Sequence, residues 1–361
     1  MSTRVLRVAT RGSALALAQA GTVAARLAAV TGASVDLVPV RTVGDSDRRA
    51  LTVIGGSGVF VGAVRAAVVG GQADVAVHSF KDLPTAPPDG LVVAAVPPRE
   101  DPRDALVARD GLALDELPDG ARIGTGSPRR AVQLAAYARR LGRTWQVAPV
   151  RGNVDTRLRA VGNGFDAVVV AAAGLARLGR SAEATQVLGA AVMLPAPAQG
   201  ALAVEAAPAV PGWLAAGLAA LDDPAAHAAA VAERAVLAEL GAGCSAPVAA
   251  LAICTGALGN GSAEAGTRVE LTALVATADG GTVWRASASG TQQAAVAVGT
   301  DVARQLLAGG AGAVAGIEPG TGIEPGTGIE PGTGIEPGTG IEPSTGIEPD
   351  IRVSGAGGRL R

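Results

Sequence analysis

A lysine and an aspartate stand side by side where a short apolar segment ends. Residues 73–77 are mostly apolar, Lys81 and Asp82 follow, and Pro84 stops the segment. Lys81 is the only lysine among the 30 lysine and arginine residues. A carboxylate near a cation stays ionised and can stabilise a positive charge that develops during a reaction. Asp82 is therefore a candidate catalytic residue, and a turn-capping aspartate before Pro84 is the alternative.

Arginines form a second candidate set, because they recur just after predicted strands. In open α/β sheets, ligands bind beyond the carboxyl ends of the strands. Guanidinium groups bind carboxylates or phosphates through two parallel hydrogen bonds, so the set predicts a ligand with several negative charges. For each position taken singly, a surface arginine in an arginine-biased protein is the alternative. The set is Arg11, Arg129, Arg130, Arg151, Arg157 and Arg177.

Two serines are placed at predicted helix starts. Ser13 precedes an Ala/Leu-rich helix, where its hydroxyl can cap the first turn. Ser127 precedes Pro128, and the free backbone N–H groups of such a helix start favour an anion. The nearby Gly124-Thr125-Gly126 is not part of a G-x-G-x-x-G or a G-x-x-x-x-G-K-[ST] motif, which argues against a nucleotide site.

The two cysteines have different surroundings. Cys244 lies in a glycine-rich loop after a helix, where a thiolate is accessible and can form a covalent adduct. Cys254 lies in an apolar strand and is predicted to be a core residue. Two cysteines do not make a disulfide framework, which fits a reducing compartment. His78 and His227 are too few and too far apart in sequence for a metal site, and His78 is expected to be packed rather than a catalytic base.

Composition limits the classes of function. The formal net charge is −2, so overall charge favours neither nucleic acid nor a membrane surface. There is no N-terminal signal pattern, and no apolar run of roughly 18 residues lacks Gly, Pro and charge. We expect a cytoplasmic protein. Because 48% of the residues are hydrophobic but only 2% are aromatic, the cores must be built from Ala, Val and Leu.

The candidate residues are positioned by two α/β segments and one α+β segment. Residues 97–104 and 194–200 are rich in proline and are predicted to be crossings between domains. The first strand, helix and second strand form a parallel β-α-β unit. The predicted strands are 5–10, 35–40, 73–77, 91–96, 122–125, 145–150, 166–171, 247–254, 269–277 and 282–288. The predicted helices are 14–30, 59–69, 128–141, one after Asn153, one from Gly174, 224–240 and one ending near Leu307.

A hexapeptide repeat, Gly-Ile-Glu-Pro-Gly-Thr, begins at Gly316. A proline in every sixth position prevents both helix and strand ladder, so the repeat predicts a disordered tail. A solenoid is the alternative for any repeat, but one isoleucine in six residues does not make a stacked core.

Taken together, these motifs resemble the hydroxymethylbilane synthase (porphobilinogen deaminase) family over about 5–307. The resemblance implies two periplasmic-binding-protein-like α/β domains that flank a cleft, plus a C-terminal α+β domain with Cys244 on a loop facing it. The implied bounds are 1–99 plus about 200–219, 103–195 and 221–310, followed by a low-complexity tail at 316–361 in a monomer. The matching segments are 9–13, 75–85, 99–104, 124–130, 151–154, 194–200, 233–235 and 243–244.

The resemblance also implies an activity. The family joins four porphobilinogen molecules head to tail with release of ammonia, on a dipyrromethane cofactor linked to a cysteine, here Cys244. The aspartate matching Asp82 stabilises the cationic pyrrole as ammonia leaves. Matches to cofactor-binding positions are Lys81, Ser13, Thr125, Ser127, Arg129, Arg130 and Arg151. Matches to substrate-binding positions are Arg11, Arg157, Arg177, Gln199 and Phe60.

The sequence departs from the family pattern at three positions. Val53 and Ser57 stand in a loop that often carries lysines, and Gly126 stands where serine is common. Two rival hypotheses remain. The first is a non-catalytic module that binds small carboxylates in the same cleft, and the second is an inactive homologue. Ammonia release from porphobilinogen would exclude both.

Overall fold

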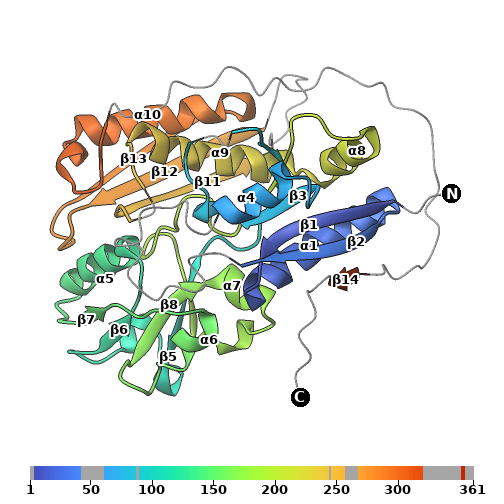
Figure 1. Ribbon diagram of the computed structural model, residues 1–361. Helices are drawn as coiled ribbons and strands as arrows, with labels where there is room; N and C mark the ends of the chain where they lie inside the picture. The colour runs from blue at the N-terminus through green and yellow to red at the C-terminus, as the bar shows by residue number, and fades with distance from the viewer. Residues whose placement is uncertain are drawn as a thin grey trace, which may run out of the picture.

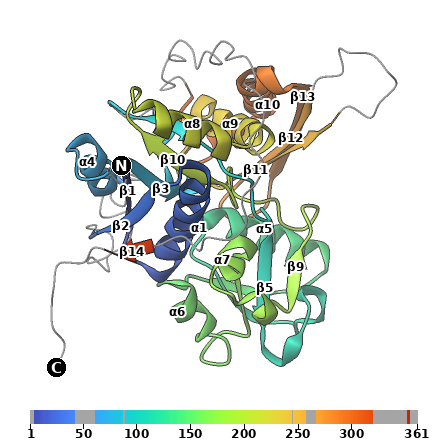
Figure 2. The same cartoon turned by 90° about the vertical axis from the view of Figure 1, so that its right-hand side faces the viewer.

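Three separate β-sheets divide the computed structural model into three regions (Figure 1, Figure 2). The structure describes residues 4–41, 61–86, 89–243, 245–256, 267–319 and the backbone of 351–353. The first sheet has the strand order β14-β2-β1-β3-β10-β4. Its elements are β1 (Val5–Arg11), α1 (Ala14–Thr31), β2 (Ser34–Val40), α4 (Gly62–Val69), β3 (Val75–Ser79), β4 (Val92–Ala95), β10 (Leu202–Ala206), α8 (Gly212–Leu221) and β14 (Ile351–Val353).

The second sheet has the order β7-β6-β8-β5-β9, and the third is the antiparallel series β11-β12-β13. Elements of the second are β5 (Asp104–Ala108), β6 (Arg122–Gly124), α5 (Pro128–Arg140), β7 (Gln146–Ala148), α6 (Val154–Leu158), β8 (Ala167–Ala171), α7 (Ala172–Arg177) and β9 (Gln186–Leu188). Elements of the third are α9 (Pro224–Glu239), β11 (Val248–Thr255), β12 (Arg268–Ala276), β13 (Val283–Thr291) and α10 (Ala295–Ala308). Single 3-10 turns are η1 (Phe80–Asp82), η2 (Arg109–Gly111), η3 (Leu114–Glu116), η4 (Ser181–Glu183), η5 (Gln292–Ala294) and η6 (Ala311–Ala313).

The first β-α-β unit forms as its sequence predicts. β1 pairs in parallel with β2, and Ser13 caps α1 by accepting a hydrogen bond from the backbone N–H of Ala16 at 3.3 Å. By length and composition, α1 is the one helix of the described residues that could cross a membrane. Its buried side chains, such as Val23 and Leu27, pack in the core of the first region instead. That core is built from Ala, Val and Leu, as the composition predicts.

Five strands and α-helices were absent from the prediction: β5, β9, β10, α8 and β14. β5 begins at Asp104, inside the segment predicted to be a crossing, and β10 contains the charged Glu205. Both carboxylates are fully buried because each pairs with arginine. A strand with a buried, paired charge does not give the uniformly apolar run by which buried strands are recognised.

The tail prediction is corrected at both of its described ends. Ile317 in the first repeat is 6% exposed and packs in the core of the third region, and the N–H of Glu318 donates to the carbonyl of Leu240 at 3.0 Å. The expectation of no strand is wrong for Ile351–Val353, which pair in parallel with β2. These three residues follow the last proline of the repeat, so a ladder is sterically allowed there. The rest of the repeat lies outside the described residues.

Candidate active site

One edge of the first sheet carries several of the predicted residues. β1 and β3 run in parallel, so Arg11 and the residues after Ser79 emerge at the same edge. A pocket there is lined by Arg11, Ser13 and Asp82, among others. Ser79 at the end of β3 is hydrogen-bonded to Gln19 of α1, with Nε2 and Oγ 2.9 Å apart. The pocket therefore joins a guanidinium, a hydroxyl and an exposed carboxylate.

The turn η1 follows β3 directly and carries Lys81 and Asp82. Phe80 is buried and anchors the turn, whereas Asp82 is exposed. Lys81 Nζ donates to Oε1 of Gln199 at 3.1 Å. Burial lowers the pKa of the Lys81 ammonium to about 8, against the opposing effect of the Asp82 carboxylate. An anion arriving beside Lys81 would relieve this penalty.

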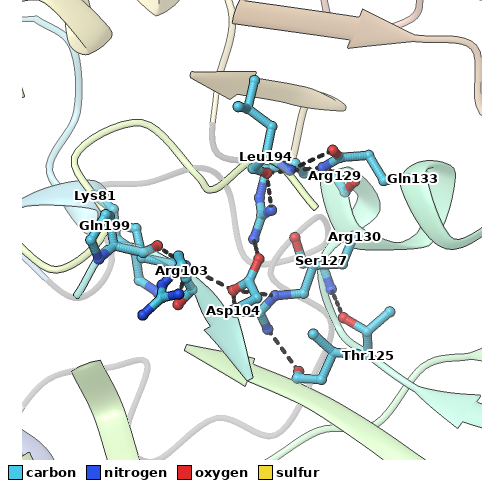
Figure 3. Close-up of polar contacts among 12 residues, drawn as sticks. Lys81, Arg103, Asp104, Thr125, Ser127, Arg129, Arg130, Gln133, Leu194 and Gln199 are labelled. Atoms are coloured by element: carbon cyan, nitrogen blue, oxygen red, sulfur yellow. Dashed lines mark hydrogen bonds and ion pairs between the residues drawn. The ribbon is translucent and has the colours of Figure 1, made fainter. Parts of the chain in front are cut away.

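A fully buried carboxylate, Asp104, organises the neighbouring edge of the second sheet (Figure 3). It accepts from Nη2 of Arg130 at 2.8 Å and Nε2 of Gln199 at 2.7 Å, and it pairs with Nη2 of Arg129 at 2.8 Å. Burial by itself would raise the pKa of the Asp104 carboxyl, but the guanidiniums and the amide lower it to about 2. Gln199 thus connects Lys81 of the first region to Asp104 of the second.

Arg129 and Arg130 are enclosed by protein groups. Their side chains are only 4% and 5% exposed. Nη1 of Arg129 donates to the carbonyl of Leu194 at 2.6 Å, and Nη1 of Arg130 donates to that of Val169 at 2.9 Å. Asp104 lies between the two guanidiniums, so Asp82 is not the lone acidic group near these bases. Asp104 was missed because its proline- and charge-rich surroundings are typical of a surface crossing.

The other predicted residues of the second region lie around the same edge. Arg151 is exposed, and Arg157 donates from Nε to the carbonyl of Gly152 at 2.9 Å. Burial and the nearby Arg130 lower the pKa of the Arg157 guanidinium, whereas Asp82 raises it. The electrostatic influence of Asp82 on Arg157 means that these two residues, from different regions, lie near each other.

Thr125 and Ser127 follow β6 at the start of α5. Thr125 is buried, and its Oγ1 accepts from the N–H of Ser127 at 3.2 Å. The Ser127 hydroxyl makes no capping hydrogen bond in α5. Arg177, at the end of α7, donates from Nη2 to the carbonyl of Gly200 at 2.6 Å, and burial lowers the pKa of its guanidinium.

The third region is attached to this site through α9. Glu233 is fully buried. Its Oε1 accepts a hydrogen bond from Nη1 of Arg99 at 2.7 Å, and its Oε2 accepts one from Nη2 at 2.9 Å. It also accepts from the backbone N–H of Ala198 and of Ala252. One carboxylate therefore joins both crossings to the third sheet. The motif Glu233-Arg234-Ala235 was the available sequence signal for this contact.

Two of the predicted site residues are not described by the structure. Cys244 and Phe60 lie outside the described residues, as do Val53 and Ser57. Before Cys244, Gly241 has φ 58° and Ala242 is buried, so the approach of the chain to this position is defined. Cys254 packs against the third core and donates from Sγ to the carbonyl of Ala225 at 3.1 Å. His78 is 6% exposed with Nε2 3.3 Å from Glu205, so it is packed, as expected.

Comparisons with known proteins identify relatives over most of the chain. A family model described as porphobilinogen deaminase, dipyromethane cofactor binding domain, matches residues 6–209, and one described as porphobilinogen deaminase, C-terminal domain, matches 227–308. Porphobilinogen deaminase 1 of Streptomyces coelicolor is 52% identical over 321 residues, covering 88% of this chain and 99% of the relative. Porphobilinogen deaminase of Nocardia farcinica is 51% identical over 320 residues, covering 87% and 90%.

Solved structures also match at low sequence identity. The methionine binding protein MetQ has a TM-score of 0.39 at 11% identity, over 60% of this chain and 89% of its own. Immunogenic lipoprotein A from Vibrio vulnificus has a TM-score of 0.39 at 12% identity, over 62% and 98%.

Proposed function

The chain belongs to the porphobilinogen deaminase family, and we propose that Asp82, Lys81 and Cys244 carry its chemistry. The protein is a transferase that joins porphobilinogen units head to tail into hydroxymethylbilane, with release of ammonia. Its dipyrromethane cofactor supplies the pyrrole end to which incoming units are added. The observation that supports our assignment is one exposed carboxylate, Asp82, at an edge crowded with cations.

The described residues fit a cofactor that bears carboxylates. Burial lowers the pKa of Lys81, Arg157 and Arg177. The positive charge of Arg130 lowers the pKa of Lys81 and Arg157 further. Cations that destabilise one another in a partly buried site favour an anionic ligand. The cofactor would be held by the thiolate of Cys244 together with Lys81, Ser13, Thr125, Ser127, Arg129, Arg130 and Arg151. The substrate's acetate and propionate would be bound by Arg11, Arg157 and Arg177, with Gln199 and Phe60 beside them.

Asp82 has the role of an electrostatic stabiliser. As the C–N bond of porphobilinogen breaks, ammonia leaves and positive charge spreads over the pyrrole nitrogen. A fixed carboxylate next to that nitrogen lowers the energy of the cationic state, whereas surrounding arginines alone would raise it. Asp82 lines the pocket and its side chain is exposed, whereas the Asp104 carboxylate is buried and hydrogen-bonded to neighbouring side chains.

For the organisation of the chain we propose domains at 1–99 plus about 200–219, 103–195 and 221–310, with a low-complexity segment at 316–361. We also propose that the protein acts as a cytoplasmic monomer without a nucleic-acid or membrane partner. The net charge of −2 and the buried packing of α1 support this proposal.

The assignment is tested by intact mass and by turnover of porphobilinogen. Purified protein should exceed its sequence mass by a two-pyrrole adduct, and Cys244→Ser should lose the excess, whereas Cys254→Ser should keep it. Asp82→Asn should keep the adduct but lose turnover by about 100-fold or more, the range for a removed electrostatic stabiliser. Unmodified protein that still forms bilane would refute the role of Cys244, and an Asp82→Asn variant with near-normal turnover would refute that of Asp82.

A further inference from the structure

Arg234 of α9 holds the turn that carries Asp82. Its Nη1 donates to the carbonyls of Leu83 at 2.9 Å and Phe80 at 3.3 Å, and its Nη2 donates to the carbonyl of Pro84. Its guanidinium carbon also lies 4.7 Å from the centre of the Phe80 ring. Every one of these contacts is to η1 or to the two residues after it, which come from a region more than a hundred residues earlier in the chain.

The geometry has a direct consequence for Asp82. The carbonyl of Phe80 also accepts from the backbone N–H of Leu83, whereas the carbonyls of Leu83 and Pro84 lie just beyond the turn, where a basic side chain can satisfy them. A guanidinium presents its donors in a rigid plane. Three carbonyl contacts and a ring contact therefore fix both the distance of the turn from α9 and its orientation. Asp82 sits inside the segment that is fixed in this way, while its own side chain remains exposed.

The same helix also leads to the covalent site. The neighbouring Glu233 binds Arg99, and α9 ends at Glu239, from which the chain continues into the loop that contains Cys244. We propose that Arg234 is a positioning residue. Because Arg234 belongs to α9, which leads into the cysteine loop, its contacts keep the Asp82 turn in a fixed position relative to that loop. The inference rests on the proposed catalytic role of Asp82.

The test measures kcat, KM and adduct mass in Arg234→Ala and Arg234→Lys. A site displaced by about 1 Å loses about 100-fold in rate, so we expect kcat to fall by about 10-fold to 100-fold with the adduct retained. Guanidinium chloride, below unfolding concentrations and against equal sodium chloride, should restore part of the activity of Arg234→Ala. Arg234→Lys should stay impaired, because an ammonium is a point donor. The control is Arg304→Ala. Arg304 is exposed and pairs with Glu239 of the same helix α9, so its replacement should leave kcat and KM unchanged.

A double-variant cycle separates this inference from the proposed function. If Arg234 acts through Asp82, then Asp82→Asn combined with Arg234→Ala should be no slower than Asp82→Asn alone. Should Arg234→Ala fail to fold, the cycle is run with Arg234→Lys. Full additivity, or normal kcat in both Arg234 variants, overturns the positioning role while the catalytic role of Asp82 stands. Near-normal turnover of Asp82→Asn alone overturns both.

Discussion

At the residue level, the site is a group of cations organised by two carboxylates in opposite environments. Asp104 is buried and fully engaged, so it serves to fix Arg129, Arg130 and Gln199 in place. Asp82 is exposed and held by its backbone, so its charge remains available to a ligand. The division of roles follows from burial, because both residues are aspartates next to basic groups.

Lys81 should set an alkaline limit on attachment of the cofactor. In the protein without cofactor, burial lowers the pKa of Lys81 to about 8, so its ammonium loses its proton as the pH rises through about 8. Binding of the cofactor's carboxylates then weakens, and the rate at which the adduct mass appears in cofactor-free protein incubated with porphobilinogen should fall above that pH. In Lys81→Arg the guanidinium stays charged, so the fall should move to higher pH. Profiles measured in the same buffers share every other ionisation. An identical fall in both proteins would exclude Lys81 as its cause.

Asp104→Asn should be strongly destabilising. It leaves two buried guanidiniums without their counter-charge, which costs about 3–5 kcal/mol in free energy of unfolding. Because folding lowers the pKa of Asp104 to about 2, its stabilisation is present above the ordinary value of 3.8 and is lost as the pH falls through about 2. Urea unfolding at pH 7 measures the loss. The control is Asp110→Asn at an exposed turn, which should change stability by less than about 0.5 kcal/mol.

At the level of elements, two strands that run against their neighbours complete the site. Asp104 at the start of β5 is paired with Ala171 at the end of β8, and Leu202 at the start of β10 is paired with Ser79 at the end of β3. Asp104, and Gln199 just before β10, therefore reach the edge where the parallel strands end. The rule that ligands bind beyond strand ends predicted Arg11 at this edge, and Arg11 is the last residue of β1. It could not predict Asp104, because Asp104 begins a strand and its long-range pairing is not visible in local patterns.

The helix α4 should depend on a buried ion pair with β10. Arg65 donates to Glu205 from Nε at 2.8 Å and from Nη2 at 2.7 Å, and Glu205 is fully buried. Glu205→Gln should cost about 3–5 kcal/mol in free energy of unfolding, since it leaves a poorly compensated charge. Replacing both partners, with Arg65→Met and Glu205→Leu, should recover most of the loss.

Hydrogen exchange locates this effect. The amides of α4 should exchange faster in Glu205→Gln than in the unchanged protein, while those of α10, in the third region, should be affected only through the global stability. If the double variant is as unstable as Glu205→Gln alone, packing rather than charge compensation holds α4 to the sheet.

At the level of the whole molecule, α9 and the two crossings join the three sheets. Most elements and the three regions were predictable from apolar periodicity and proline-rich crossings, because these signals are local, whereas β5, β9, β10, α8 and β14 were not predicted. The contacts that join the regions could not be predicted in this way, because residues such as Arg99 and Glu233 are 134 residues apart in the sequence. The same limit explains Ile317, whose repeat pattern signals disorder although its side chain fills a place in the third core.

Two truncations should separate the structured start of the repeat from the remainder. Removing residues 320–361, which include β14 at the end of the first sheet, should leave turnover and adduct mass unchanged, because β14 pairs with β2 and the described site residues lie between Arg11 and Gln199. Removing 316–361 also takes away buried Ile317 and the hydrogen bond from Glu318 to Leu240. Both truncations remove β14, and loss of one buried isoleucine costs about 1.5–3 kcal/mol, so the longer truncation should have a free energy of unfolding lower than the shorter one by about that amount. Since Leu240 directly follows α9 and precedes the cysteine loop, we expect adduct formation to slow in the longer truncation as well. Equal stability of the two proteins would mean that Ile317 contributes nothing to the core in which it lies.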